Sequence, residues 1–136
     1  MPRLLIVDDE ADIRDSLSRH FRFLDYDVET AANGVEALEI MRKRRFQVVI
    51  SDIMMPKMDG IDLLRQVRSN YPMTHVVMIT GYVTMENILS CMRHGADTCV
   101  FKPIEDITEL ETAVSQASAM IDNWRSKLKQ LTGMSS

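Results

Sequence analysis

Short apolar runs recur along this chain and are separated by longer amphipathic stretches. Such runs, bounded by polar and turn residues, are typical of strands buried on both faces of a parallel sheet. A run with strict alternation of polar and apolar residues would instead favour a half-exposed strand. The runs that we interpret as strands are LLIV (4–7), FQVVIS (46–51), HVVMI (75–79) and TCVF (98–101), and DVETA (27–31) is a further short strand.

The segments between these runs carry apolar residues at helical spacing. In the first, Ile13, Leu17, Phe21 and Leu24 recur at steps of three or four residues, which predicts one buried helix face. Alternating strands and helices with right-handed crossovers predict an α/β fold, a three-layer α/β/α sandwich around a five-stranded parallel sheet. The predicted helices lie at 9–24, 33–44, 61–70 and 83–94, with one long helix after Lys102.

Length and charge limit the classes of protein. A chain of 136 residues suits one domain with an ordinary core. With 16 basic and 20 acidic residues, the net charge of −4 gives no general reason to expect direct nucleic-acid or membrane binding, and no apolar run approaches the length of a membrane span. The four basic residues at 42–45 suit the end of a helix, which we prefer to a binding patch. Two cysteines, spaced unlike a zinc site, favour a reduced, cytoplasmic compartment.

Polar side chains follow four of the predicted strands at the point where each strand ends. They are Asp8 and Asp9, Asp52, Thr80 and Lys102. Ligands of open parallel sheets bind at the carboxyl ends of the strands. We therefore expect these five side chains to converge at one edge of the sheet.

Three carboxylates together concentrate negative charge that proteins rarely leave unpaired. An oxygen-liganded divalent cation is a natural partner, and Mg²⁺ fits because it combines a few carboxylates with waters and phosphate oxygens. Lys102 supplies a compact positive charge for Asp52 or for a phosphate, and Thr80 supplies a neutral donor. An aspartate with an ordinary pKa of about 3.9 needs no general base at neutral pH. The set predicts phosphoryl transfer onto Asp52.

Each residue also has a plainer interpretation. Asp8 read alone is a helix cap, Thr80 before a glycine is turn chemistry, and Lys102 before a proline is the start of a helix with a solvated lysine. The methionines that follow Asp52, Met54 among them, are read alone as packing residues. The coincidence of these polar groups at four strand ends favours a functional site.

The chain resembles the receiver domains of two-component response regulators, from Arg3 to about residue 120. The resemblance implies the doubly wound, flavodoxin-like strand order 2-1-3-4-5. The motifs that carry it are IVDDE (6–10), SDIMMPKMDG (51–60), MITGY (78–82), HGAD (94–97) and FKPI (101–104).

The resemblance also implies roles for individual residues. Asp52 would be the phosphoacceptor, with Lys102 and Thr80 on the phosphoryl oxygens and a cis peptide before Pro103. The metal site would hold Mg²⁺ through Asp9, Asp52 and the main-chain carbonyl of Met54, with Asp8 acting mainly through water. The phosphoryl group would come from the phosphohistidine of a histidine kinase or phosphotransfer protein. The chain would catalyse only its own phosphorylation and dephosphorylation, and would not be an enzyme otherwise.

One position departs from the usual receiver sequence, and two others predict how long the phosphoryl group persists. Receivers usually carry an aromatic residue three positions before the lysine, where this chain has Cys99. Phe101 and Tyr82 are both alternatives for that aromatic residue, and a switch without one is equally open. Met54 and Tyr82 lie two positions after the acceptor and the threonine, where bulky side chains that cannot orient water predict slow self-dephosphorylation.

We divide the chain into a receiver domain at 1–120 and an extension of the last helix at 121–136. The region after Lys102 is too short for a further output domain, which predicts a single-domain receiver; a receiver cut from a longer regulator would look identical. A phosphatase of the haloacid-dehalogenase type would need a second acid two residues after Asp52, where Met54 stands. A flavodoxin-like cofactor binder would need a hydroxyl- and glycine-rich loop where this chain has Asp-Asp-Glu.

The last helix carries a long apolar stripe at alternating steps of four and three residues, the heptad spacing of a helix seam. Its first part is the core-facing face of the helix, but Trp124, Leu128 and Leu131 would project beyond the sheet. This predicts a homodimer, or docking to another protein, through the C-terminal helix. The stripe consists of Leu110, Val114, Ala117, Ile121, Trp124, Leu128 and Leu131.

Overall fold

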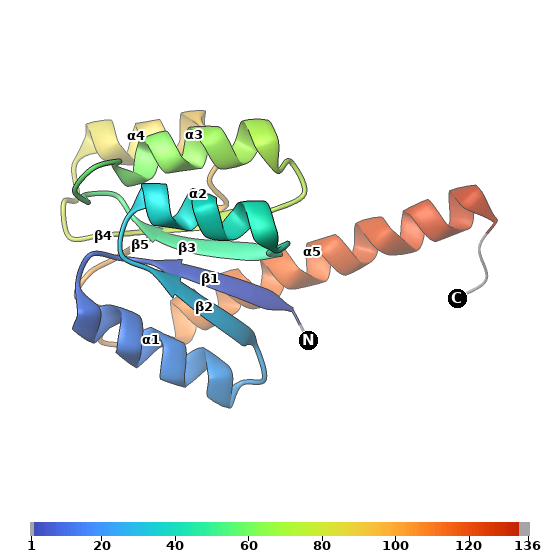
Figure 1. The fold of residues 1–136 in the computed structure, drawn as a ribbon, viewed down its shortest axis with the longest axis horizontal. Coiled ribbons are helices and arrows are strands. Elements are labelled where there is room, and N and C mark those ends of the chain that lie inside the picture. Colours follow the sequence, from blue (N-terminus) through green and yellow to red (C-terminus); the bar gives the residue numbers. More distant parts are fainter. Residues whose placement is uncertain (1, 134–136) are drawn as a thin grey trace.

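The computed structural model describes residues 2–133, in which five strands alternate with five helices (Figure 1). Residue 1 and residues 134–136, at the ends of the two ranges that we expected for the domain and its extension, lie outside the described part. The strands are β1 (Arg3–Val7), β2 (Asp27–Ala31), β3 (Val48–Asp52), β4 (His75–Thr80) and β5 (Thr98–Phe101). The helices are α1 (Ala11–Phe23), α2 (Gly34–Lys43), α3 (Gly60–Asn70), α4 (Met85–Arg93) and α5 (Thr108–Thr132).

The strands form one parallel sheet in the order β2-β1-β3-β4-β5, which confirms the predicted fold. The register aligns the strand ends, since Val7 lies opposite Ser51, Asp52 opposite Ile79, and Thr80 opposite Phe101. All five carboxyl ends therefore meet at the same edge of the sheet.

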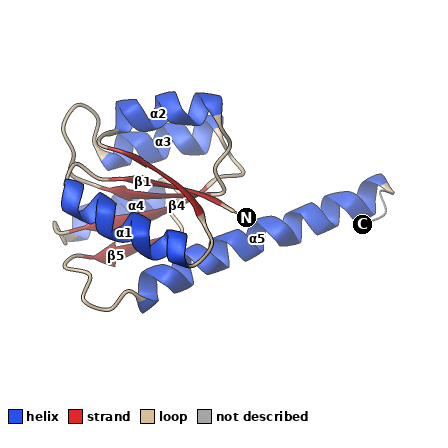
Figure 2. Ribbon diagram, turned by 60° about the horizontal axis from the view of Figure 1, so that its bottom comes forward, coloured by secondary structure: helices blue, strands red, loops and turns tan. Residues whose placement is uncertain are grey.

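Helices cover both faces of the sheet, with α2, α3 and α4 on one side and α1 and α5 on the other (Figures 1 and 2). Because successive side chains of a strand point to opposite faces, Leu5 and Val7 join the apolar cluster under α2 to α4, and Leu4 and Ile6 join the one under α1 and α5. Two apolar clusters separated by the sheet confirm the three-layer sandwich.

Several element boundaries differ from the predicted ones by one or two residues. The strand predicted from Phe46 begins at Val48, because pairing with β1 starts there even though Phe46 is buried. The helix predicted from residue 83 begins at Met85, because the Thr84 side chain accepts a hydrogen bond from Asn87 N at 3.1 Å and caps the helix. Burial alone therefore does not identify the ends of these elements.

Helix α5 packs against the sheet along its first half and then projects away from the domain (Figures 1 and 2). Ile121 is the last residue of its buried stripe. Beyond it, Trp124 is 55% exposed, Leu128 54% and Leu131 83%. The predicted division of the stripe into a core-facing and a projecting part is confirmed.

Candidate functional site

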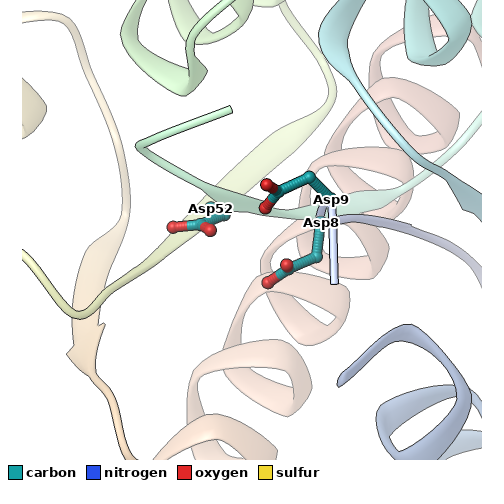
Figure 3. Close-up of side chains that lie close together, drawn as sticks. All are labelled: Asp8, Asp9 and Asp52. Atoms are coloured by element: carbon teal, nitrogen blue, oxygen red, sulfur yellow. The ribbon is translucent and has the colours of Figure 1, made fainter. Parts of the chain in front are cut away.

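Three carboxylates gather at the carboxyl ends of β1 and β3. Asp8 and Asp9 directly follow β1, and Asp52 is the last residue of β3. One carboxylate oxygen from each lies within 4.8 Å of the other two (Figure 3). Asp8 and Asp52 are buried and Asp9 is exposed, so the cluster opens to solvent on the side of Asp9.

Lys102, which follows β5, bridges two of these carboxylates. Its Nζ donates hydrogen bonds to Asp8 Oδ2 at 2.9 Å and to Asp52 Oδ2 at 3.1 Å. Its main-chain N–H donates to Thr80 O at 2.8 Å, which ties the residue to the end of β4. The Lys102–Pro103 peptide is cis, as the resemblance implied.

Burial and pairing perturb the ionisation of these groups. Burial raises the pKa of Asp52, and this effect outweighs the stabilisation of the carboxylate by Lys102. Burial also opposes the charged form of Lys102, but the hydrogen bonds to Asp8 and Asp52 outweigh it and raise the pKa of the ammonium group. Our prediction of an ordinary pKa for Asp52 was therefore wrong, because strand patterns do not reveal how completely a strand end is buried.

Thr80 and Met54 lie at the same edge without joining the hydrogen-bonded cluster. The Thr80 side chain is fully buried, and its Oγ1 accepts a hydrogen bond from Tyr82 N at 2.9 Å. Within residues 2–133 it makes no hydrogen bond to the three carboxylates. Met54 lies in the loop after β3 and is 48% exposed. The structure thus brings four of the five predicted side chains into one cluster and places Thr80 and Met54 beside it.

The plainer interpretation of Asp8 as the helix cap was wrong, although its side chain makes a local contact. Its Oδ1 accepts a hydrogen bond from Glu10 N at 2.9 Å, a local turn contact. The residue that caps α1 is Glu10, without a side-chain hydrogen bond. One oxygen of Asp8 thus shapes the turn, and the other holds Lys102.

Gly60, which the sequence shows only as the last residue of the motif at 51–60, is a positioning residue. A Cβ at this position would overlap Asp52 O and would lie 2.9 Å from the Asp52 carbonyl carbon and the Ile53 Cα. Gly60 N donates a hydrogen bond to Ile53 O at 2.7 Å, which draws the start of α3 onto the end of β3. No feature of the sequence beyond the glycine itself signals this close approach.

The cluster is suited to a hard divalent cation. Three carboxylates face one ammonium group, and the Arg14 guanidinium binds Asp8 through the main-chain O at 2.6 Å and not through the carboxylate. Carboxylate oxygens at this spacing are the ligands that Mg²⁺ uses, with its other positions left to water or phosphate. The residues that could hold it are Asp8, Asp9 and Asp52.

Comparison with known proteins finds one family and the same fold. The family model of the response regulator receiver domain matches residues 4–115. The regulatory protein AtoC of Escherichia coli K12 is 39% identical over 115 residues, which cover 85% of this chain and 25% of AtoC. The response regulator MprA of Mycobacterium sp. strain KMS is 37% identical over 101 residues, which cover 74% of this chain and 44% of MprA.

Solved structures of response regulators have the same fold. A CheY-like response regulator receiver domain protein from Methanospirillum hungatei superposes with a TM-score of 0.84 at 32% identity, covering 90% of this chain and 98% of that one. The response regulator protein TrrA of Thermotoga maritima, in complex with Mg(2+)-BeF, gives a TM-score of 0.78 at 32% identity, covering 86% and 99%. The chain spans less than half the length of AtoC and of MprA.

Proposed function

This chain belongs to the response regulator receiver domains, and on that premise we propose that it carries a phosphoryl group on Asp52 in a two-component or phosphorelay pathway. Receiver domains interact with histidine kinases or phosphotransfer proteins, and we take the donor to be the phosphohistidine of such a partner. The observation that carries the proposal is the bridge from Lys102 Nζ to Asp8 and Asp52, with the Asp9 carboxylate beside it.

The chemical step needs an ionised acceptor and a neutralised phosphoryl group. An Asp52 carboxylate oxygen attacks phosphorus, the new P–O bond forms, and the P–N bond to the donor imidazole breaks. Lys102, released from Asp52, pairs with a phosphoryl oxygen and keeps its contact with Asp8. Mg²⁺, when bound, neutralises the phosphoryl oxygens and the carboxylates. Positioning and charge provide most of the catalysis in such a transfer.

We assign the remaining roles from the family motifs that this chain carries. Asp9, Asp52 and the main-chain carbonyl of Met54 would ligate Mg²⁺, and Asp8 would act mainly through water. Thr80 would donate its hydroxyl hydrogen to a phosphoryl oxygen. Its present hydrogen bond is accepted from Tyr82 N, so the hydroxyl hydrogen is available for that contact.

The test is phosphorylation by a small-molecule donor. Acetyl phosphate with Mg²⁺ should add one phosphoryl group to the protein, measured by intact mass, and the adduct should be stable in acid and labile in base. Asp52→Asn should abolish the adduct, whereas Asp122→Asn, which changes an exposed carboxylate on the projecting part of α5, should leave it unchanged. Full labelling of Asp52→Asn would show that Asp52 is not the acceptor.

We propose that the domain signals by binding a partner protein through the surface formed by α4, β5 and α5. Several apolar side chains are exposed on the first two of these elements, including Met85 at 76%, Met92 at 69% and Phe101 at 49%. Such a patch is typical of a protein-binding surface. Direct nucleic-acid contact is not part of the proposal, in line with the net charge of −4.

We further propose that residues 1–120 act as the receiver unit and 121–136 as an extension. The family match ends at residue 115, and Ile121 is the last buried residue of α5. We take the unit to signal as a single domain; the alternative is a receiver segment of a longer regulator. The mass of the native protein, detected in its source cells with an antibody against this chain, distinguishes the two.

We place the protein in the cytoplasm, where its two cysteines would remain free thiols. Within residues 2–133 no helix combines the length and the apolar character needed to cross a membrane.

The exposed stripe on the projecting part of α5 supports a second proposal, that two copies associate through this helix. Trp124, Leu128 and Leu131 are exposed in one row. Sedimentation should show a dimer for the full chain that Leu128→Glu, or truncation after Asn123, converts to a monomer, while Ser126→Glu does not. A monomeric full chain, with and without beryllofluoride and Mg²⁺, would leave docking to another protein as the role of the stripe.

A further inference from the structure

The two cysteines of the chain lie together between α4 and β5, with Cys91 buried and Cys99 partly exposed. Cys91 comes from α4 and Cys99 from β5, and both are free thiols. Cys91 belongs to the apolar cluster between the sheet and α2 to α4, and Cys99 packs against that cluster. The turn between the helix and the strand folds back onto the helix, because Ala96 N donates to Cys91 O at 3.0 Å.

The two thiols also influence each other's ionisation. Interaction with the Cys99 thiol lowers the pKa of Cys91. The same contact, together with burial, raises the pKa of Cys99. A thiolate is the reactive form of cysteine, and a second thiol beside it serves as the resolving group when the first is oxidised. Either thiol of such a pair can be oxidised first, and the other then resolves it.

A cavity gives small molecules access to the pair. It has a volume of about 260 Å³, and both cysteines line it together with Ile88, Met92 and Phe101. Met92 and Phe101 are largely exposed, so the cavity reaches the protein surface. A water molecule occupies about 30 Å³ of liquid, and a peroxide is only slightly larger.

We propose that Cys91 and Cys99 form a peroxide-sensitive dithiol that closes into a disulfide between α4 and β5. One of the two, as the thiolate, attacks one oxygen of hydrogen peroxide, so that an S–O bond forms, the O–O bond breaks, and the released hydroxide takes a proton to become water. The sulfur of the other cysteine then attacks this sulfenic acid. The S–S bond forms, the S–O bond breaks, and the hydroxyl leaves with the proton of the second thiol as a second water. Two thiols lose two electrons in total, and one peroxide gains them; a small thiol reverses the bridge by exchange.

The bridge would join α4 to the strand that leads into Lys102. Cys99 lies three residues before Lys102, and Phe101 pairs in register with Thr80. A covalent link at this point would make α4 move together with β5. The restraint of the response to phosphorylation by this link rests on the proposed function. The formation of the disulfide itself does not depend on that function.

The native protein is first treated with hydrogen peroxide, then unfolded and alkylated with iodoacetamide. Intact mass should show a loss of two hydrogens and no alkylation, non-reducing peptide mapping should recover Cys91 linked to Cys99, and dithiothreitol should restore two alkylatable thiols. Cys91→Ala and Cys99→Ala should each show an oxygen adduct or an intermolecular disulfide instead. Two alkylatable thiols in the peroxide-treated wild type, or the same oxygen adducts as in the single variants, would overturn the proposal.

Two further measurements separate the bridge from the phosphoryl chemistry. Asp52→Asn should form the bridge as the wild type does, so that failure of the proposed function and failure of this inference are distinguishable. Amide hydrogen exchange of residues 85–93 should slow in the oxidised protein and return to its original rate after reduction. Unchanged exchange in a protein shown to be bridged would refute the coupling of α4 to β5.

Discussion

Replacing Gly60 with alanine should damage the site more than the same replacement at any other glycine of the chain. Alanine is intrinsically a better helix residue than glycine, by about 1 kcal/mol in a helix interior. If helix propensity decided the outcome, Gly60→Ala would stabilise the protein. The structure predicts the opposite, because the added Cβ would meet the main chain at the end of β3.

The magnitude follows from the overlap. Non-bonded carbon atoms pack at about 3.5–4.0 Å, whereas the Cβ would lie 2.9 Å from two main-chain carbons of Asp52 and Ile53 and even closer to Asp52 O. The start of α3 or the end of β3 must therefore move by about 1 Å. Overpacking of this kind costs about 1–3 kcal/mol, and we expect the upper end because main-chain atoms cannot rotate away. Misplacement of a reacting group by about 1 Å lowers rates by about 10²-fold.

Urea unfolding and the rate of labelling by acetyl phosphate measure the two effects. The control is Gly81→Ala, where the added Cβ would find its nearest neighbour, Lys102 Cβ, at 3.9 Å. We expect that variant to stay within about 0.5 kcal/mol of the wild type. A Gly60→Ala protein that is as stable and as rapidly labelled as Gly81→Ala would refute the steric argument.

Three other predictions concern the same site. Asp9→Ala should weaken Mg²⁺ binding, because it removes an oxygen ligand, as measured by calorimetric titration or by the rise in melting temperature with Mg²⁺. Equal Mg²⁺ affinities for Asp9→Ala and the wild type would exclude Asp9 from the site. Lys102→Ala should retain metal binding and slow the phosphoryl transfer. The pKa of Lys102 is raised by its two carboxylate partners, so while these are ionised its contribution to stability should be complete below the unfolded value of about 10.4 and disappear as the pH rises through the folded value. The stability difference between wild type and Lys102→Met should therefore be flat from the pH at which Asp52 is ionised up to about 10.4 and then fall. Self-dephosphorylation should be slow and should accelerate in Tyr82→Glu or Met54→Asn, whose side chains can orient water; identical decay of the phosphorylated forms would contradict this role.

The strands and helices could be predicted from the sequence because the spacing of apolar residues that defines them is local. Four of the five strands are short apolar runs, and the stripe of α5 separates into a packed and a projecting part at Ile121, as its spacing and the usual length of the family predicted. The positions of Asp8, Asp52 and Lys102 at strand ends followed from the same pattern, since parallel strands bring their carboxyl ends together.

Other features of the site depend on contacts between residues far apart in the sequence, which no local sequence pattern predicts. The bridge from Lys102 to both Asp8 and Asp52, and the raised pKa of Asp52, depend on how completely the strand ends are buried. The approach of Gly60 to the Asp52 main chain depends on the path of the loop between them. The pairing of Cys91 with Cys99 requires the helix to lie on the strand that follows it, which spacing alone does not determine.

The projecting part of α5 can amplify small movements of the domain. The first half of the helix packs against β3, β4 and β5, so any displacement of those strands is transmitted to its base. Beyond Ile121 the helix continues to Thr132, a length of about 16 Å at the rise of an α-helix. A tilt of about 10° at the base would swing the tip by about 3 Å over this length. Gaps of about 0.5–1 Å already forfeit a quarter to a half of a van der Waals contact, so a shift too small to disturb the sheet can separate or join surfaces at the tip.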